Sequence, residues 1–424
     1  MTGEHGHHHV RSWLTAPVLA VAVLSVGAGI SAFGVTVVIG DVAADLSHPP
    51  ASDDTPFQLG LPVTTIGIAL SVIRLASLAS LPLAALADRL GRRRLLLTVA
   101  TLALSLTSLA AASPGFWWYV ALVAIARPFL STVNAVAGVV AAEESRSVDR
   151  AGAIALITVA YGLGSGLVSV GRGLLPGEPS FRVVTLFALA PLLLMPLLTR
   201  WIREPAIAVV RTHARGLPGA VPRHLRGRVT LLASLVGAIA ITTGPGFTYL
   251  FVYGERVLGA TPLQLSSFVL AAGPAGLTGI LLGRWSADRF GRRITGALAM
   301  SGTGIAVAIA YSGGSAALAV GYLTTVLLAS AFAPAQGTLA AELVPTTVRA
   351  TVAGWLTVTA VLGAVLGLSA FGALAEITGS FAVPARLLGG LVALSALGFG
   401  ALPETRGTEL EDLDADPLQP RPEP

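Results

Sequence analysis

Long apolar stretches separated by short polar or charged breaks dominate the chain. A membrane-spanning helix needs about 20 mostly apolar residues, and cutting the chain at its charged and Gly/Pro-rich breaks leaves twelve segments that qualify. They run over Trp13–Gly40, Leu59–Leu86, Leu95–Ser113, Phe116–Val140, Ala151–Val170, Val183–Leu198, Val229–Tyr253, Ser266–Gly283, Ile294–Ser312, Ala316–Ala341, Ala350–Leu374 and Pro384–Leu402. The pattern predicts an all-α membrane protein with twelve transmembrane helices.

The distribution of arginine predicts how these helices are oriented. All 27 basic residues are arginine, because the chain contains no lysine. When alternate loops are assigned to opposite sides of the bilayer, one side collects Arg11, Arg89, the cluster Arg92–Arg94, Arg146, Arg150, the run from Arg200 to Arg228, Arg289, Arg292, Arg293 and Arg349. The other side has only Arg172, Arg182, Arg256 and Arg386. Arginine-rich loops stay cytoplasmic, so we expect a multi-pass protein of the cytoplasmic (plasma) membrane with both termini inside.

The longest connection, Thr199–Arg228, lies between the sixth and seventh segments and is polar and arginine-dense. It predicts a linker between two six-helix halves. We therefore expect cytoplasmic tails at residues 1–12 and 403–424, bundles at 13–199 and 229–402, and a cytoplasmic linker at 200–228.

Two motifs recur between the halves. The run Ala87–Arg93 (ADRLGRR) returns 200 residues later as Ala287–Arg293 (ADRFGRR). The pair Glu143 and Arg150 returns 199 residues later as Glu342 and Arg349. Each copy sits after the second or fourth segment of its half, so the sequence predicts an internal duplication and two pseudo-symmetric bundles.

At these residues the sequence resembles the major facilitator superfamily, whose signature loop after the second helix reads approximately G-x-x-x-D-R-x-G-R-R. Here Ala84 and Arg284 occupy the first position of the two copies, so neither keeps the initial glycine. The segment Pro403–Gly407 (PETRG) resembles the tail of sugar porters and related metabolite:proton symporters. Ala341–Thr351, followed by Gly354 and Trp355, is similar to the aromatic-acid and metabolite symporters of that branch. The aromatic-acid branch carries paired aspartates in its first helix, whereas this chain has no carboxylate there before Asp41.

The resemblance implies the major facilitator fold, a small-molecule substrate moved by alternating access, and a proton as the coupling ion without a cofactor. It also implies that Asp88 latches onto the eleventh helix and Asp288 onto the fifth. A carboxylate at a helix end can accept bonds from free N–H groups of another helix, and Glu143 with Arg150 and Glu342 with Arg349 are expected to extend each latch. The predicted gating residues are Asp88, Arg89, Gly91, Arg92, Arg93, Glu143, Arg150, Asp288, Arg289, Gly291, Arg292, Arg293, Glu342 and Arg349. The alternative is that these arginines have no gating role and only set the orientation of the helices in the membrane.

Two arginines fall in mid-span. Arg74 precedes Asp88 by 14 residues and Arg127 precedes Glu143 by 16, which places them about 21 Å and 24 Å along their helices from the arginine-rich side. An uncompensated arginine at this depth costs about 2.5–3.5 kcal/mol or more. Each therefore predicts a polar cavity or a partner, while snorkelling or a bond to a backbone carbonyl is the structural alternative.

Small and polar residues form stripes at helical spacing beside these arginines. The stripes contain Gly67, Ser71 and Arg74; Arg127, Ser131, Asn134 and Gly138; Thr158, Tyr161 and Ser165; Thr242, Gly246, Tyr249 and Tyr253; and Thr325 with Gln336. Such stripes line pathways, but ordinary helix packing in membranes also uses them. Arg74, Arg127, Asn134, Tyr161, Thr242, Tyr249, Gln336 and Asp41 are the predicted residues of substrate binding or coupling.

No Asp, Glu or His lies at the centre of any predicted span. Two central cations without a central anion favour an anionic metabolite as substrate, because a carboxylate can accept bidentate bonds from guanidinium. Asp41 is the candidate for proton coupling, and a solvated acid at the helix mouth is its alternative interpretation. Glu376 with Arg386 is expected to form an ion pair at the outer surface.

Composition narrows the function further. The chain is 54% hydrophobic and 12% charged, against about 25% charged residues in soluble proteins. The absence of cysteine excludes thiolate chemistry and Cys-ligated metals, and no phosphate loop or nucleophile–base pair suggests an enzyme. The histidines at positions 5, 7, 8 and 9 are interpreted as a solvated tail rather than a metal site.

We therefore expect a secondary transporter that acts as a monomer in the lipid bilayer and binds no nucleic acid. A proton-coupled efflux antiporter for drug-like compounds is the main alternative. A membrane sensor built on the same scaffold is the other, although the tails are short for a signalling domain.

Overall fold

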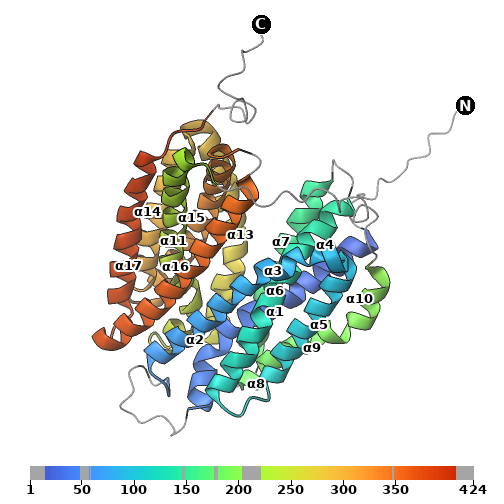
Figure 1. Ribbon diagram of the computed structural model, residues 1–424. Coiled ribbons are helices and arrows are strands. Elements are labelled where there is room, and N and C mark those ends of the chain that lie inside the picture. The colour runs from blue at the N-terminus through green and yellow to red at the C-terminus, as the bar shows by residue number, and fades with distance from the viewer. Residues whose placement is uncertain are drawn as a thin grey trace, which may run out of the picture. The chain divides into compact units, whose positions relative to one another are not determined.

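The computed structural model describes residues 15–47, 57, 59–145, 149–175, 180–202, 221–345 and 348–406. The predictions for the first tail, its histidine cluster, most of the linker and the end of the second tail lie outside the described residues. Within the described ranges, every regular element is a helix (Figure 1).

Over these described residues, the structure confirms twelve helices that are long and apolar enough to cross a membrane, at the twelve predicted places. The first five spans are α1 (Ala16–Asp45), α2 to α3 (Val63–Ala76 and Ser80–Ala85, joined by η2 at Ser77–Ala79), α5 (Arg92–Ala110), α6 (Phe116–Glu143) and α7 (Arg150–Leu174). The sixth span is interrupted and consists of α8 (Phe181–Thr185), η3 (Leu186–Ala188), α9 (Leu189–Leu193) and α10 (Met195–Trp201). The last six spans are α11 (Arg223–Thr248), α13 (Pro262–Phe290), α14 (Arg292–Ala310), α15 (Ser315–Glu342), α16 (Arg349–Thr378) and α17 (Ala382–Ser395) with η6 (Ala396–Ala401). Two short helices, α4 (Ala87–Leu90) and α12 (Leu250–Arg256), complete the described elements.

Several helices extend beyond their predicted ends. Helix α1 continues to Asp45 rather than Gly40, and α16 to Thr378 rather than Leu374. Hydropathy marks only the apolar part of a span, whereas the backbone hydrogen bonds continue through the polar residues that follow it.

The chain divides into two compact units. The first contains residues 1–42 and 76–215, and the second contains residues 43–75 and 216–424. These boundaries do not coincide with the predicted halves, because Val63–Leu75, most of α2, belongs to the second unit. The small side chains that permit this lie at Gly67 and Gly372, which face each other across α2 and α16.

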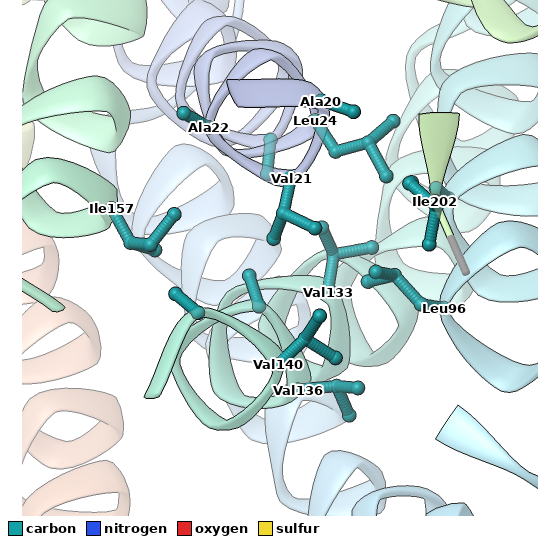
Figure 2. Close-up of a cluster of buried hydrophobic side chains, with 14 of the residues drawn as sticks. Ala20, Val21, Ala22, Leu24, Leu96, Val133, Val136, Val140, Ile157 and Ile202 are labelled. Carbon is teal, nitrogen blue, oxygen red and sulfur yellow. The ribbon is translucent and has the colours of Figure 1, made fainter. Parts of the chain in front are cut away.

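The first unit is built around α1, which packs against α5, α6 and α7. Val21, Leu24, Leu96 and Val133 are among the fully or nearly fully buried side chains of this core (Figure 2). Aliphatic side chains fill the space, so close packing helps to hold these helices together.

The second unit contains several close helix crossings, of which two illustrate the packing. Gly363 and Gly367 of α16 lie against backbone of α11, while Gly279 and Gly283 of α13 lie against backbone of α15. A Cβ atom at any of these four positions would overlap a carbonyl group. Helix association in membranes depends on such close approach, since lipid supplies little hydrophobic driving force between helices.

Candidate transport site and gating motifs

The two copies of the repeated loop have the same backbone geometry. Gly91 lies between α4 and α5 with φ of 86°, and Gly291 lies between α13 and α14 with φ of 102°. Residues with a side chain rarely adopt positive φ, so the glycine of each copy permits the sharp turn into the next helix. We call the end of each unit that carries this loop its motif end.

The last arginine of each loop is bonded to the final span of its half. Arg93 donates to the carbonyl oxygens of Ile202 at 2.7 Å and Thr199 at 2.9 Å. Arg293 donates to those of Phe399 at 3.0 Å and Gly400 at 2.6 Å. A guanidinium at a helix C-terminus satisfies carbonyl groups that have no partner within the helix. Each motif end is thereby tied together by the same contact.

The acidic residue of each second motif pairs with the loop. Glu143 forms an ion pair with Arg92, and Glu342 forms one with Arg292 at 3.2 Å. Each glutamate thus joins the charge network of its loop, while the expected part of Arg150 and Arg349 in that network stays a prediction. Those two arginines donate to main-chain oxygens eight residues earlier, Ala142 at 3.1 Å and Ala341 at 3.0 Å, because the preceding helix ends in free carbonyl groups there.

The structure does not test the predicted latch contacts of the two loop aspartates, Asp88 and Asp288. The side chain of Asp88 lies outside the described side chains, and that of Asp288 is 62% exposed and 3.7 Å from Arg292. Arg89 and Arg289 are exposed. The latches onto the eleventh and fifth helices stay predictions.

Sequence reasoning missed the role of Glu404 in the PETRG segment. Its carboxylate accepts hydrogen bonds from the backbone N–H groups of Arg292 at 2.9 Å and Arg293 at 3.2 Å, the first residues of α14. Burial acts to raise the pKa of Glu404, but the N–H groups of Arg292, Arg293, Arg406 and Thr405 outweigh it and hold the pKa below its usual value. Thr405 also donates to Glu342. The segment thus joins the charge network of the second motif end.

The mid-span arginines differ in what surrounds them. Arg127 lies 11 residues into α6 and is half-buried, and its Nε is buried with no hydrogen-bond partner within the described part of the chain. Arg74 is half-buried in α2. The two belong to different units.

The other predicted binding residues fall into two groups. Asn134 is exposed, and Tyr161 and Gln336 are half-buried. Thr242 and Tyr249 are fully buried. The hydroxyl of Thr242 donates to Leu388 O at 3.2 Å and that of Tyr249 to Leu368 O at 3.4 Å, so in this structure both hydroxyls serve helix packing.

Asp41 is paired rather than solvated. Its carboxylate accepts a bond from Arg172 on α7 at 2.6 Å, and the two side chains are only 17% and 4% exposed. The sequence analysis identified Asp41 as a candidate but not Arg172, which it used only to predict the orientation of the helices in the membrane. The two residues lie 131 positions apart on different helices, and helical spacing in the sequence predicts neighbours only within one helix.

One contact of the second unit, here called the α2–α16 contact, joins these two helices. It is formed by Thr64, Gly67, Ser71, Ser369 and Glu376. Glu376 accepts a bond from the backbone N–H of Thr64 at 2.9 Å. Ser71 donates to Val365 O at 3.0 Å and lies 2.8 Å from the hydroxyl of Ser369. The predicted ion pair between Glu376 and Arg386 is absent from the described residues, because Glu376 is directed at the start of α2 instead. Buried rings of Tyr249, Phe371, Phe381 and Tyr311 pack beside this contact.

Comparison with known families decides the class of protein. The model of the Major Facilitator Superfamily matches residues 19–287. The chain belongs to this superfamily. The model of the sugar (and other) transporter family matches residues 220–416, which confirms the resemblance to the sugar-porter branch. A comparison with curated protein sequences gives no match.

Solved structures support the same fold. The inward-open xylose transporter XylE from E. coli is 15% identical, with 94% of this chain and 98% of that chain covered and a TM-score of 0.70. A D-xylose-proton symporter is 16% identical over 93% and 99%, with a TM-score of 0.71. The nucleoside transporter NupG is 14% identical over 91% and 99%, with a TM-score of 0.71. Family and fold are those of multi-pass membrane transporters of small molecules rather than of enzymes.

Proposed function

We propose that this superfamily member is a secondary active transporter of a small organic solute, with an anionic metabolite as substrate, and that it works by alternating access in the cytoplasmic membrane. The arginine-rich motif ends are assigned to the cytoplasm, since the positive-inside rule places them there. Both termini follow to that side, because the number of spans is even.

The observation that carries the choice of an anion is Arg127. It lies about 17 Å from one end of α6 and about 24 Å from the other, so it is near the centre of a hydrocarbon layer about 30 Å thick. No described carboxylate pairs with its guanidinium. A substrate carboxylate would supply the missing charge through hydrogen bonds of about 1.5–3 kcal/mol each.

Proton coupling is assigned to the pair of Asp41 and Arg172. Protonation of Asp41 would remove the charge that holds Arg172, and a buried arginine that loses its counterion must find another partner or move. The related D-xylose-proton symporter is proton-linked by its name, which supports a proton as the coupling ion here.

The test is transport in proteoliposomes with an imposed pH gradient, using a panel of carboxylate metabolites and neutral sugars. Arg127→Gln should reduce the apparent affinity for carboxylates by about tenfold or more, the effect of losing one charged hydrogen bond, and should spare neutral solutes. The exposed Arg386→Gln is the matched control for loss of one arginine. Equal transport of carboxylates by the parent and Arg127→Gln would refute the anionic substrate.

The direction of solute transport is measured in the same proteoliposomes. Accumulation driven by an inward proton gradient identifies a symporter, whereas gradient-driven extrusion of cationic drug-like compounds would establish the efflux antiporter instead. Asp41→Asn should abolish gradient-driven accumulation but retain exchange of labelled for unlabelled solute, because exchange needs no net proton movement.

A further inference from the structure

A pocket with a surplus of positive charge lies at the motif end of the second unit. Its volume is about 560 Å³, and it is lined by Leu281, Arg284, Trp285, Asp288, Arg289 and Arg406. The first five residues belong to α13, and Arg406 comes from the PETRG segment. The backbone N–H of Arg406 donates to Glu404 at 3.2 Å, so the contact of Glu404 with α14 also places Arg406 at the pocket.

The three arginines have no counterion in the part of the chain that the structure describes. None of them forms an ion pair there, and Asp288, the only acid among the lining residues, lies nearest to Arg292. All three are exposed. Guanidinium groups bind phosphate through paired hydrogen bonds and are less strongly hydrated than ammonium. The pocket is therefore complementary to a phosphate group.

The pocket continues into an apolar helix face. Leu281 and Leu277 precede Arg284 by three and seven residues, a spacing that places all three on one face of α13. The side chains of Leu281 and Leu277 are 67% and 54% exposed, and that of Trp285 is 56% exposed. Tryptophan prefers the membrane–water interface. A free inorganic anion would use only the arginines, whereas a phospholipid would use both the arginines and the leucines.

The pocket is specific to the second copy of the repeat. The residues 200 positions before Arg284, Trp285 and Arg406 are all alanine, at positions 84, 85 and 206. Only Arg289 has an arginine counterpart, Arg89. The loop geometry needs none of the three added side chains, because the first copy makes the same turn at Gly91 without them.

We propose that this pocket binds the phosphate headgroup of an anionic phospholipid, with Arg284, Arg289 and Arg406 on the phosphate and Leu277 and Leu281 along an acyl chain. The site is separate from the transported solute. It requires only that the motif end of α13 lies at the membrane surface, and the proposal stands whatever the substrate is.

The test uses full-length protein in nanodiscs of phosphatidylcholine with or without phosphatidylglycerol, and native mass spectrometry counts the lipids that are retained. The pocket variant is Arg284→Gln with Arg406→Gln. The matched control is Arg223→Gln with Arg228→Gln, which removes the same charge from exposed positions of α11 in the same unit. Arg284→Lys keeps the charge but loses the planar, bidentate geometry.

Phosphatidylglycerol should bind the parent and the control alike, about tenfold more weakly to the double pocket variant, and with intermediate strength to Arg284→Lys. Binding should fall as salt rises. Equal retention by the parent and the pocket variant, or equal loss in the control, would overturn the proposal. Displacement of the lipid by inorganic phosphate would assign the site to a free anion. Pocket variants that alter transport in pure phosphatidylcholine without altering lipid retention would overturn the proposal.

Discussion

The close approach of α2 to α16 at Gly67 should control access to the α2–α16 contact of the second unit. A Cβ atom at Gly67 would lie 2.7 Å from Leu368 O and 2.9 Å from the hydroxyl of Tyr249. Ordinary contacts begin near 3.4 Å, so Gly67→Val forces the helices apart by about 0.7 Å before its two methyl groups are counted. The change does not weaken α2 itself, because valine forms helix more readily than glycine.

This displacement acts on the hydrogen bonds that join the two helices on either side of Gly67. Thr64 N–H with Glu376 and Ser71 with Val365 O and Ser369 span 2.8–3.0 Å, and each bond contributes about 0.5–1.5 kcal/mol. Losing about two of them costs about 1–3 kcal/mol, a factor of about 5–150 in the population of the closed contact.

The assay exploits the absence of cysteine from the chain. Val63 is 1% exposed at the start of α2, so Val63→Cys reports opening through its rate of labelling by a membrane-impermeant maleimide. Gly67→Val should raise that rate about 5- to 150-fold. Gly273→Val is the matched control, since a side chain there meets open space. Equal rates in the two valine variants would refute the reasoning.

Three further predictions concern the charged contacts. Glu404→Gln should destabilise the second unit by about 0.5–2 kcal/mol, the usual range for a helix N-cap, in thermal unfolding at pH 7. Because the pKa of Glu404 is lowered in the folded protein, its contribution is complete above the ordinary value of 4.5 and is lost as pH falls through the folded pKa; a difference between parent and variant that does not shrink as the pH is lowered progressively below 4.5 would contradict this. Arg92→Glu and Glu143→Arg should each lower the melting temperature, and the double exchange should restore much of it; additive losses would exclude a direct pair. Asp41→Ala should cost about 3 kcal/mol, because Arg172 is left buried without its counterion, and Asp41→Ala with Arg172→Leu should recover stability in the same melting assay.

The spans and the duplication were predictable because both are local or periodic properties of the chain. Apolar runs locate the twelve helices, and a fixed offset of 200 exposes the repeat. Partners across helices were not predictable in the same way. The repeat grouped Glu143 with Arg150 in one expected charge network, but it did not reveal that Glu143 pairs with Arg92 of another helix.

The internal repeat contains a sequence signal that could have predicted the importance of Glu404. Glu204 lies 200 residues before Glu404, in the same relation that links Arg93 to Arg293. One carbonyl partner of each arginine, Thr199 for Arg93 and Phe399 for Arg293, obeys that relation as well. By contrast, nothing in the sequence reveals that Tyr249 is enclosed by aromatic rings, because a polar stripe looks the same whether it faces water or another helix.

The dependence of α14 on Glu404 has a consequence for how the protein is made. The start of α14 leaves the ribosome long before Glu404, which comes after all the described spans. Until that residue is synthesised, the N–H groups of Arg292 and Arg293 lack their acceptor and Glu342 lacks Thr405. The second unit is therefore completed by one of its last residues to emerge, and a ribosome stalled before Glu404 should hold a membrane-inserted chain that remains more sensitive to protease at the α13–α14 turn.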